Sequence, residues 1–165
     1  MKIIAGLGNP GRQYELTKHN AGFIILDNFI LQKSLVWEFN SKVNAAICKF
    51  ENVLLVKPQT FMNNSGTCIS NVLSYFNTQP NQLLVIHDDV DLEFEKVKKT
   101  RGSSSAGHHG VEDIIQKLGT NDFWRLRIGV GRPQANNFDV EEWVLSQFFA
   151  KELEFIQSIE VPLNF

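Results

Sequence analysis

Two short segments near the start of the chain hold residue types that could carry out hydrolysis. They are residues 6–11, Gly-Leu-Gly-Asn-Pro-Gly, and residues 17–22, Thr-Lys-His-Asn-Ala-Gly. The imidazole of His19 titrates near neutral pH and can take a proton from water, and the amide of Asn9 can both donate and accept a hydrogen bond. Glycines let the backbone approach a ligand closely. Together the two segments indicate one site.

Three later segments add polar groups of the same kind, and they are residues 57–66, 87–92 and 102–110. A carboxylate such as that of Asp88 fixes the tautomer of a histidine and raises its basicity. Carboxylates at alternate positions could instead bind Mg²⁺. No second acidic group has an obvious ligand spacing, so we expect Asp89 and Asp91 to be turn and helix-capping groups.

The elements that must position these residues follow an α/β pattern, in which short apolar runs alternate with segments of helical period. Strands are predicted over residues 2–6, 43–50, 53–56, 83–86, 96–101 and 125–130. Helices are predicted over residues 21–33, 66–76, 111–118 and 151–159. The hairpin between the second and third strands favours a twisted mixed sheet, mostly parallel and flanked by helices. The strand over 83–86 leads into His87 and Asp88, and ligands gather at such strand ends.

Length and composition limit the possible classes of protein. The 165 residues are 43% hydrophobic and contain no repeat or linker, so residues 1–165 are predicted to form a single domain. The net charge of −2 means that a nucleic-acid partner must be held by a local basic patch. Cys48 and Cys68 lack metal-ligand or redox spacing and are interpreted as structural residues of a reducing compartment. The sequence shows no signal peptide or membrane span, which predicts a cytoplasmic protein.

In their order and spacing, these segments resemble the bacterial peptidyl-tRNA hydrolases over about residues 2–145. The resemblance implies an esterase that cleaves the bond between the peptide and the 3′-terminal ribose of prematurely released peptidyl-tRNA, which recycles tRNA during translation. His19 matches the catalytic base that activates water, and Asp88 matches the carboxylate that orients it. The resemblance also implies a metal-independent monomer without a cofactor. For His19 alone, a helix-capping role would be the simpler interpretation.

Further residues match the substrate-binding positions of that family. Asn9 and Asn63 match amides that position the peptide end, and Asn9 helps to reject aminoacyl-tRNA with a free amine. Phe61 marks backbone that engages the peptidyl-ribose, and Tyr14 matches an aromatic residue that could stack on the terminal adenine. Outside that resemblance, the asparagines could be turn residues and Tyr14 a partly buried loop residue.

The resemblance also assigns a basic pair to the phosphate of the acceptor stem. Lys98 and Arg127 match the basic positions that clamp this phosphate in the family. Lys98 has several basic neighbours in the same predicted strand. Side chains alternate between the two faces of a strand, so Lys96 and Lys98 are expected on one face and Lys99 on the other.

Two features of the chain depart from the family pattern. The fourth segment usually reads Gly-His-Asn-Gly, whereas this chain has His109 where the family has a substrate-contacting asparagine. A protonated imidazole there would oppose protonation of His19 and lower its apparent pKa. The chain also ends at Phe165, before the further basic helix that is common in the family, so tRNA affinity is expected to be weaker.

Two other functions fit parts of the sequence. A non-catalytic RNA-binding relative would keep the cleft but lose the reaction. His109 and the short C-terminal segment are consistent with this function. The intact set of Asn9, His19, Asn63 and Asp88 argues against it. A nucleotide-binding enzyme could use residues 6–11 to cradle a phosphate, but the glycine spacing differs from the dinucleotide fingerprint and no P-loop lysine follows.

Overall fold

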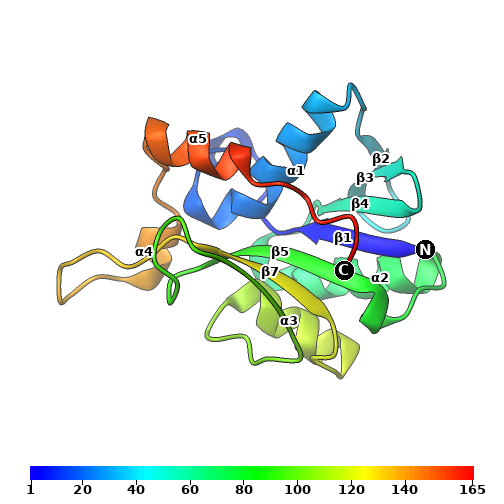
Figure 1. Cartoon of the computed structure of the whole chain (residues 1–165). Coiled ribbons are helices and arrows are strands. Elements are labelled where there is room, and N and C mark those ends of the chain that lie inside the picture. The colour runs from blue at the N-terminus through cyan, green and yellow to red at the C-terminus, as the bar shows by residue number, and fades with distance from the viewer.

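A seven-stranded sheet forms the centre of the computed structural model, which describes residues 1–165 (Figure 1). Its strands are β1 (Lys2–Gly6), β2 (Glu38–Asn40), β3 (Ala45–Phe50), β4 (Val53–Pro58), β5 (Leu83–Asp89), β6 (Val97–Arg101) and β7 (Trp124–Gly129). Their order across the sheet is β2-β3-β4-β1-β5-β7-β6. The four central strands are parallel, and the pairs β2-β3, β3-β4 and β6-β7 are antiparallel. The predicted mixed, mostly parallel sheet is therefore confirmed.

Helices cover both faces of this sheet. They are α1 (Ala21–Gln32), α2 (Ser65–Tyr75), α3 (His109–Leu118), α4 (Val140–Val144) and α5 (Ala150–Ser158). Neighbouring residues of β1 contribute to separate cores: Ile4 packs under α1 and α5, whereas Ile3 packs against α2 and α3. This division follows from the alternation of side chains along a strand. No helix is both long and apolar enough to cross a membrane.

Strand β5 delivers polar residues to the centre of the molecule. All seven of its residues are buried, and its apolar run ends in His87, Asp88 and Asp89. Parallel central strands are covered on both faces, which explains the uninterrupted apolar run. The carboxyl end of β5 therefore holds three buried polar side chains beside the ends of β1 and β7.

Two glycines allow α1 to lie almost in contact with the backbone of β1 and β5. A Cβ atom on Gly22 would lie 2.4 Å from the carbonyl oxygen of Ile86, and one on Gly6 would lie 2.4 Å from the carbonyl oxygen of Gly22. Neither position can hold a larger side chain without moving backbone. This close crossing brings the residues before α1 to the end of β5.

The structure corrects several expectations. Most element boundaries shift by one or two residues, while β2 and α4 were not predicted because each is too short to show a periodicity. Asp89 does accept a hydrogen bond from the backbone N–H of Asp91, as a turn residue would, but no helix follows for either residue to cap. Cys48 and Cys68 are buried free thiols, one in each core.

The glycine-rich segment 6–11 does not form a phosphate cradle. The N–H of Leu7 donates to the carbonyl of Ile86 at 3.0 Å, and the N–H of Asn9 donates to the side chain of Asn20 at 2.8 Å. Pro10 has no N–H to offer. Two amides of this turn are thus used to hold the fold together and Pro10 supplies none, so the structure does not support the nucleotide-binding alternative.

Candidate active site

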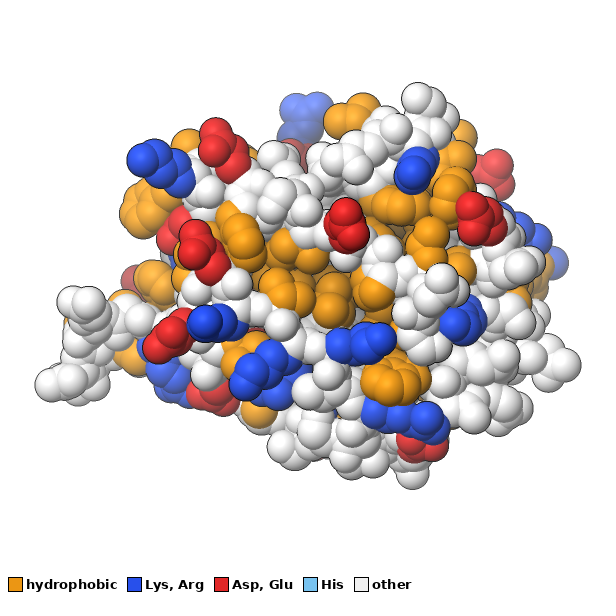
Figure 2. All heavy atoms as spheres, in the orientation of Figure 1, with side chains coloured by type: hydrophobic (Ala, Val, Ile, Leu, Met, Phe, Trp, Pro, Cys, Tyr) orange, Lys and Arg blue, Asp and Glu red, His pale blue; other side chains and the backbone are white.

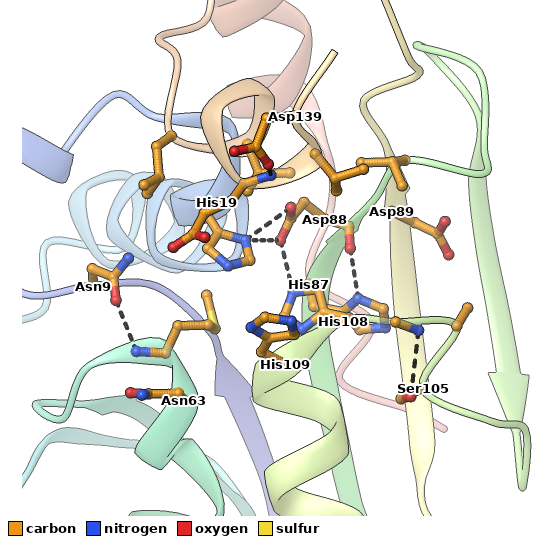
Figure 3. A pocket seen from close by; sticks show the side chains of 18 of the residues that line it. Asn9, His19, Asn63, His87, Asp88, Asp89, Ser105, His108, His109 and Asp139 are labelled. Atoms are coloured by element: carbon orange, nitrogen blue, oxygen red, sulfur yellow. Dashed lines mark hydrogen bonds and ion pairs between the residues drawn. The ribbon is translucent and has the colours of Figure 1, made fainter. Parts of the chain in front are cut away.

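His19 lies in a single 3-10 turn, Lys18–Asn20, directly before α1. Its Nδ1 lies 3.0 Å from both carboxylate oxygens of Asp88 (Figure 3). An ionised carboxylate only accepts hydrogen bonds, so Nδ1 carries the hydrogen and Nε2 holds the lone pair. The Nε2 atom is thus the basic nitrogen of this imidazole.

A second histidine, His108, contacts the same carboxylate. Its Nε2 lies 2.9 Å from Oδ1 of Asp88, while its Nδ1 accepts a hydrogen bond from the backbone N–H of Val111 at 3.2 Å. In the neutral ring only one nitrogen carries hydrogen, so this backbone contact makes Nε2 the donor to Asp88. The family resemblance assigns a substrate contact to position 109 and gives no role to His108. The signal in the sequence was that His108 is the histidine of the Gly-His-Asn-Gly pattern, in which only the next position differs in this chain.

Asp88 is held in its ionised form by these two rings. It is almost completely buried, and burial alone would raise its pKa. The charges and hydrogen bonds of His19 and His108 outweigh burial, so the pKa of Asp88 falls far below its ordinary value. The carboxylate can therefore stabilise a positive charge that develops on His19.

The His19 imidazole is tuned by opposing influences. Burial lowers its pKa, the charge of Asp88 and the hydrogen bond that His19 donates to Asp88 raise it, and Glu141 adds a smaller upward contribution. The net effect is a raised pKa. Glu141 belongs to α4, so this unpredicted helix contributes directly to the electrostatics of the site.

The donor set argues against a metal ion at this cluster. The ligand atoms of His19, Asp88 and His108 lie within 4.8 Å of one another. However, a metal needs a lone pair on each nitrogen. Both nitrogens that face Asp88 carry hydrogen in this arrangement, and the tautomer of His108 is fixed by Val111. The other predicted carboxylates are engaged elsewhere, Asp89 with Arg127 and Asp91 with Arg132.

All four histidines of the chain line one pocket of about 720 Å³. His87 is fully buried, and its Nδ1 donates to the backbone carbonyl of Asp88 at 2.7 Å. Burial, together with the charge of His108, holds the pKa of His87 well below its ordinary value. His87 is therefore a neutral ring bonded to the end of its own strand, β5, and its Nε2 has no protein partner.

Asn9 has a fixed orientation in the pocket wall. Its Oδ1 accepts a hydrogen bond from the backbone N–H of Met62 at 2.7 Å, which assigns the amide unambiguously. Asn20 holds the backbone of Asn9 from both sides, accepting from its N–H and donating to its carbonyl. The amide nitrogen of Asn9 therefore faces the pocket as a donor. The sequence had left open whether this side chain would donate or accept.

The other predicted substrate-binding residues also line this pocket. Tyr14 and Phe61 meet edge to face with ring centroids 6.3 Å apart, and Phe61 is largely exposed. Asn63 and His109 are exposed residues of the wall. The structure thus brings five predicted residues around His19 and Asp88.

The two predicted phosphate-binding residues lie outside the pocket. Lys98 on β6 and Arg127 on β7 are cross-strand partners, so their side chains share one face of the sheet. Lys98 is exposed, whereas Nε of Arg127 donates to Oδ2 of the buried Asp89 at 2.8 Å. The ion pair fixes one edge of the guanidinium close to the end of β5.

Helix α4 forms a wall that the sequence did not reveal. It contributes Val140, Glu141 and Val144 to the pocket. Lys18 anchors the segment that follows α4. Its Nζ donates to the hydroxyl of Ser146 and to the backbone carbonyl of Gln147, both at 3.0 Å. The residue before His19 therefore ties this wall to the turn that holds His19.

Comparisons with known proteins bear directly on this site. A family model described as peptidyl-tRNA hydrolase matches residues 3–161. This chain belongs to the peptidyl-tRNA hydrolase family. The peptidyl-tRNA hydrolase of Mycoplasma capricolum is 47% identical over 95% of this chain and 86% of the relative, and that of Mycoplasma mycoides is 44% identical over 100% and 92%.

The solved structures of peptidyl-tRNA hydrolases agree with the fold. The enzyme from Acinetobacter baumannii superposes with a TM-score of 0.85 at 29% identity, over 94% of this chain and 81% of that one. The predicted family, fold class and enzymatic nature are therefore confirmed, and so is the reaction class, hydrolysis of peptidyl-tRNA. The pocket around His19 and Asp88 is the candidate active site of this peptidyl-tRNA hydrolase.

Proposed function

We propose that Nε2 of His19 takes a proton from a water molecule, which attacks the ester carbonyl that joins the peptide to the 3′-terminal ribose of tRNA. The carbon–oxygen bond to water forms, and the bond to the ribose oxygen breaks. The imidazolium then returns its proton to the leaving ribose oxygen, so atoms and charges balance. The proposal is supported chiefly by the contact between His19 Nδ1 and Asp88, which leaves Nε2 as the free base.

Asn9 stabilises the oxygen of the attacked carbonyl in this proposal. Its Oδ1 is committed to the N–H of Met62, so only its Nδ2–H groups remain for substrate. A fixed donor aimed at a developing oxyanion lowers the barrier most when it needs no reorganisation, and the hold of Asn20 on Asn9 supplies that rigidity. Asn63, at the exposed rim, contacts the peptide backbone. His109 contributes a further hydrogen-bonding group to the same wall.

The nucleic-acid end of the substrate meets aromatic and basic residues. Tyr14 and Phe61 form an edge-to-face pair at the pocket mouth, where an unpaired terminal base can stack. Lys98 and Arg127 lie beyond the pocket and offer positive charge to a phosphate of the acceptor stem. We further propose that the enzyme acts as a monomer in the cytoplasm without a cofactor, since translation supplies its substrate there.

The test is release of the acyl group from N-acetyl-aminoacyl-tRNA by the purified chain, beside His19→Asn and beside aminoacyl-tRNA with a free amine. We expect hydrolysis of the blocked substrate, little hydrolysis of the free one, and a loss of at least ~10²-fold in kcat for His19→Asn. Full activity in the His19 variant would overturn the assignment of the base. Tight tRNA binding without cleavage by the unaltered chain would favour the non-catalytic alternative.

A further inference from the structure

Strand β6 carries an unusual concentration of positive charge for a chain with a net charge of −2. Residues 96–101 read Lys-Val-Lys-Lys-Thr-Arg and include no acidic residue. The strand is the outermost one at its edge of the sheet, and all its side chains except that of Thr100 are exposed. Figure 2 shows Lys and Arg side chains gathered in a band across the lower half of the visible face, beneath an apolar strip.

The strand register distributes these cations over both faces of the sheet. Lys98 pairs with Arg127 on the face that the proposed function already uses. Lys99 pairs with Leu126, which belongs to the core under α1 and α5, so Lys99 lies on the opposite face. Arg101, two residues further, shares that face with its cross-strand partner, Trp124.

Trp124 acts as a platform for the two cations of this second face. Nζ of Lys99 lies 5.3 Å from the centroid of its ring, and Cζ of Arg101 lies 5.6 Å from it. Arg101 also pairs with Asp122, whose carboxylate accepts from Nε at 2.7 Å and from a terminal nitrogen at 3.1 Å. Lys99 takes part in none of the ion pairs of the chain.

We propose that Lys99, Arg101 and Trp124, here called the Trp124 surface, form a second contact for the phosphate backbone of the tRNA substrate. Lys99 and Arg101 are two residues apart on a strand, roughly 6.6 Å, which is close to the spacing of consecutive phosphates along one RNA strand. Both cations lie over the ring of Trp124, and positively charged side chains bind phosphate, so phosphates rather than bases are the groups recognised. This proposal rests on the proposed function.

The position of the surface suits a stem that leaves the active site. Asp88, at the pocket, is the cross-strand neighbour of Ile128 on β7. Trp124 lies four residues before Ile128 on the same strand, so it is roughly 13 Å from the pocket along the strand direction. No strand lies beyond β6 at this edge of the sheet. An RNA backbone that meets Lys98 near the pocket can therefore continue along the edge to Lys99 and Arg101.

The experiment compares the double variant Lys99→Gln/Arg101→Gln with the unaltered enzyme on two substrates. One is full-length N-acetyl-aminoacyl-tRNA, and the other is an N-acetyl-aminoacyl ester of the three terminal nucleotides. We expect KM for the full-length substrate to rise roughly three- to tenfold at low salt with kcat unchanged. The dependence of log KM on log salt should become shallower by about 0.7–0.9 for each lost contact. Kinetics on the short ester should not change.

Lys49→Gln is the matched control, since Lys49 is an exposed lysine on β3 toward the opposite edge of the sheet. The double variant also removes the contact between Arg101 and Asp122. If that loss impairs folding, Lys99→Gln alone gives the same test, with about half the change in the salt dependence of log KM. An unchanged KM for full-length tRNA, or an equal rise for the short ester, overturns the Trp124 surface as an RNA contact. Failure of the proposed function is distinct, because then the unaltered enzyme would not cleave the short ester or would not need His19.

Discussion

His108 donates its Nε2–H to Oδ1 of Asp88 at 2.9 Å, so two imidazoles share one buried carboxylate. The backbone N–H of Val111 fixes the tautomer of His108 and makes this donation obligatory for the neutral ring. The arrangement orients the carboxylate, both of whose oxygens lie 3.0 Å from Nδ1 of His19. His108 thus acts on the reaction through Asp88, as a positioning residue.

Replacement of His108 with Ala should lower kcat by roughly 10- to 100-fold, because a hydrogen bond to a charged group is worth about 1.5–3 kcal/mol. His108→Gln, which can still donate to Asp88, should recover part of the loss. Single-turnover kinetics on N-acetyl-aminoacyl-tRNA measure the effect. His109→Ala serves as the neighbouring control, and an equal loss of kcat in both Ala variants would contradict a specific role for His108.

Glu141→Gln should shift the acidic limb of the pH profile of kcat/KM to lower pH. Glu141 raises the pKa of His19, so removal of its charge lowers that pKa and leaves more imidazole in the basic form at acidic pH. Glu142→Gln is the control, since Glu142 lies next to it in α4 and has no such influence on His19. A limb that stays in place in Glu141→Gln would show that α4 does not tune the base.

The exchange His109→Asn restores the residue type that the family usually carries there. The coupling expected from the sequence would move the acidic limb to higher pH on this exchange, but His109 is not among the groups that set the pKa of His19 in the structure, so we expect the limb to stay in place. A shift to higher pH would be opposite to that expected for Glu141→Gln, so the two effects can be told apart in one series of pH profiles. An unchanged profile for His109→Asn rejects the coupling.

Gly22→Ala should destabilise the enzyme and misplace His19. The added Cβ would lie 2.4 Å from the carbonyl oxygen of Ile86, so α1 must move away from β5. Overpacking of this kind costs roughly 1–3 kcal/mol of unfolding free energy, which urea denaturation can measure. Ser74→Ala, at an exposed position of α2, should change stability by less than about 0.5 kcal/mol. Equal stability of the two variants would refute the close-crossing argument.

The extent of sequence-based prediction differed between the fold and the site. Alternation of apolar runs gave the α/β class and most elements, because central strands and amphipathic helices have strong periodicities. The short elements β2 and α4 have no measurable period, and so the pocket wall that holds Glu141 stayed hidden. The gathering of His19 and Asp88, 69 residues apart, was expected only through the family resemblance.

By itself, the sequence determined the chemical groups that are available: a histidine base, a carboxylate after a buried strand, and a basic edge strand. Tertiary structure decided how those groups are committed. It paired His108 with Asp88, turned the oxygen of Asn9 toward Met62, and engaged Arg127 with Asp89. Such choices depend on distances of about 3 Å between residues far apart in the chain, and no local pattern encodes them because a hydrogen bond forms only where the folded backbone brings donor and acceptor together.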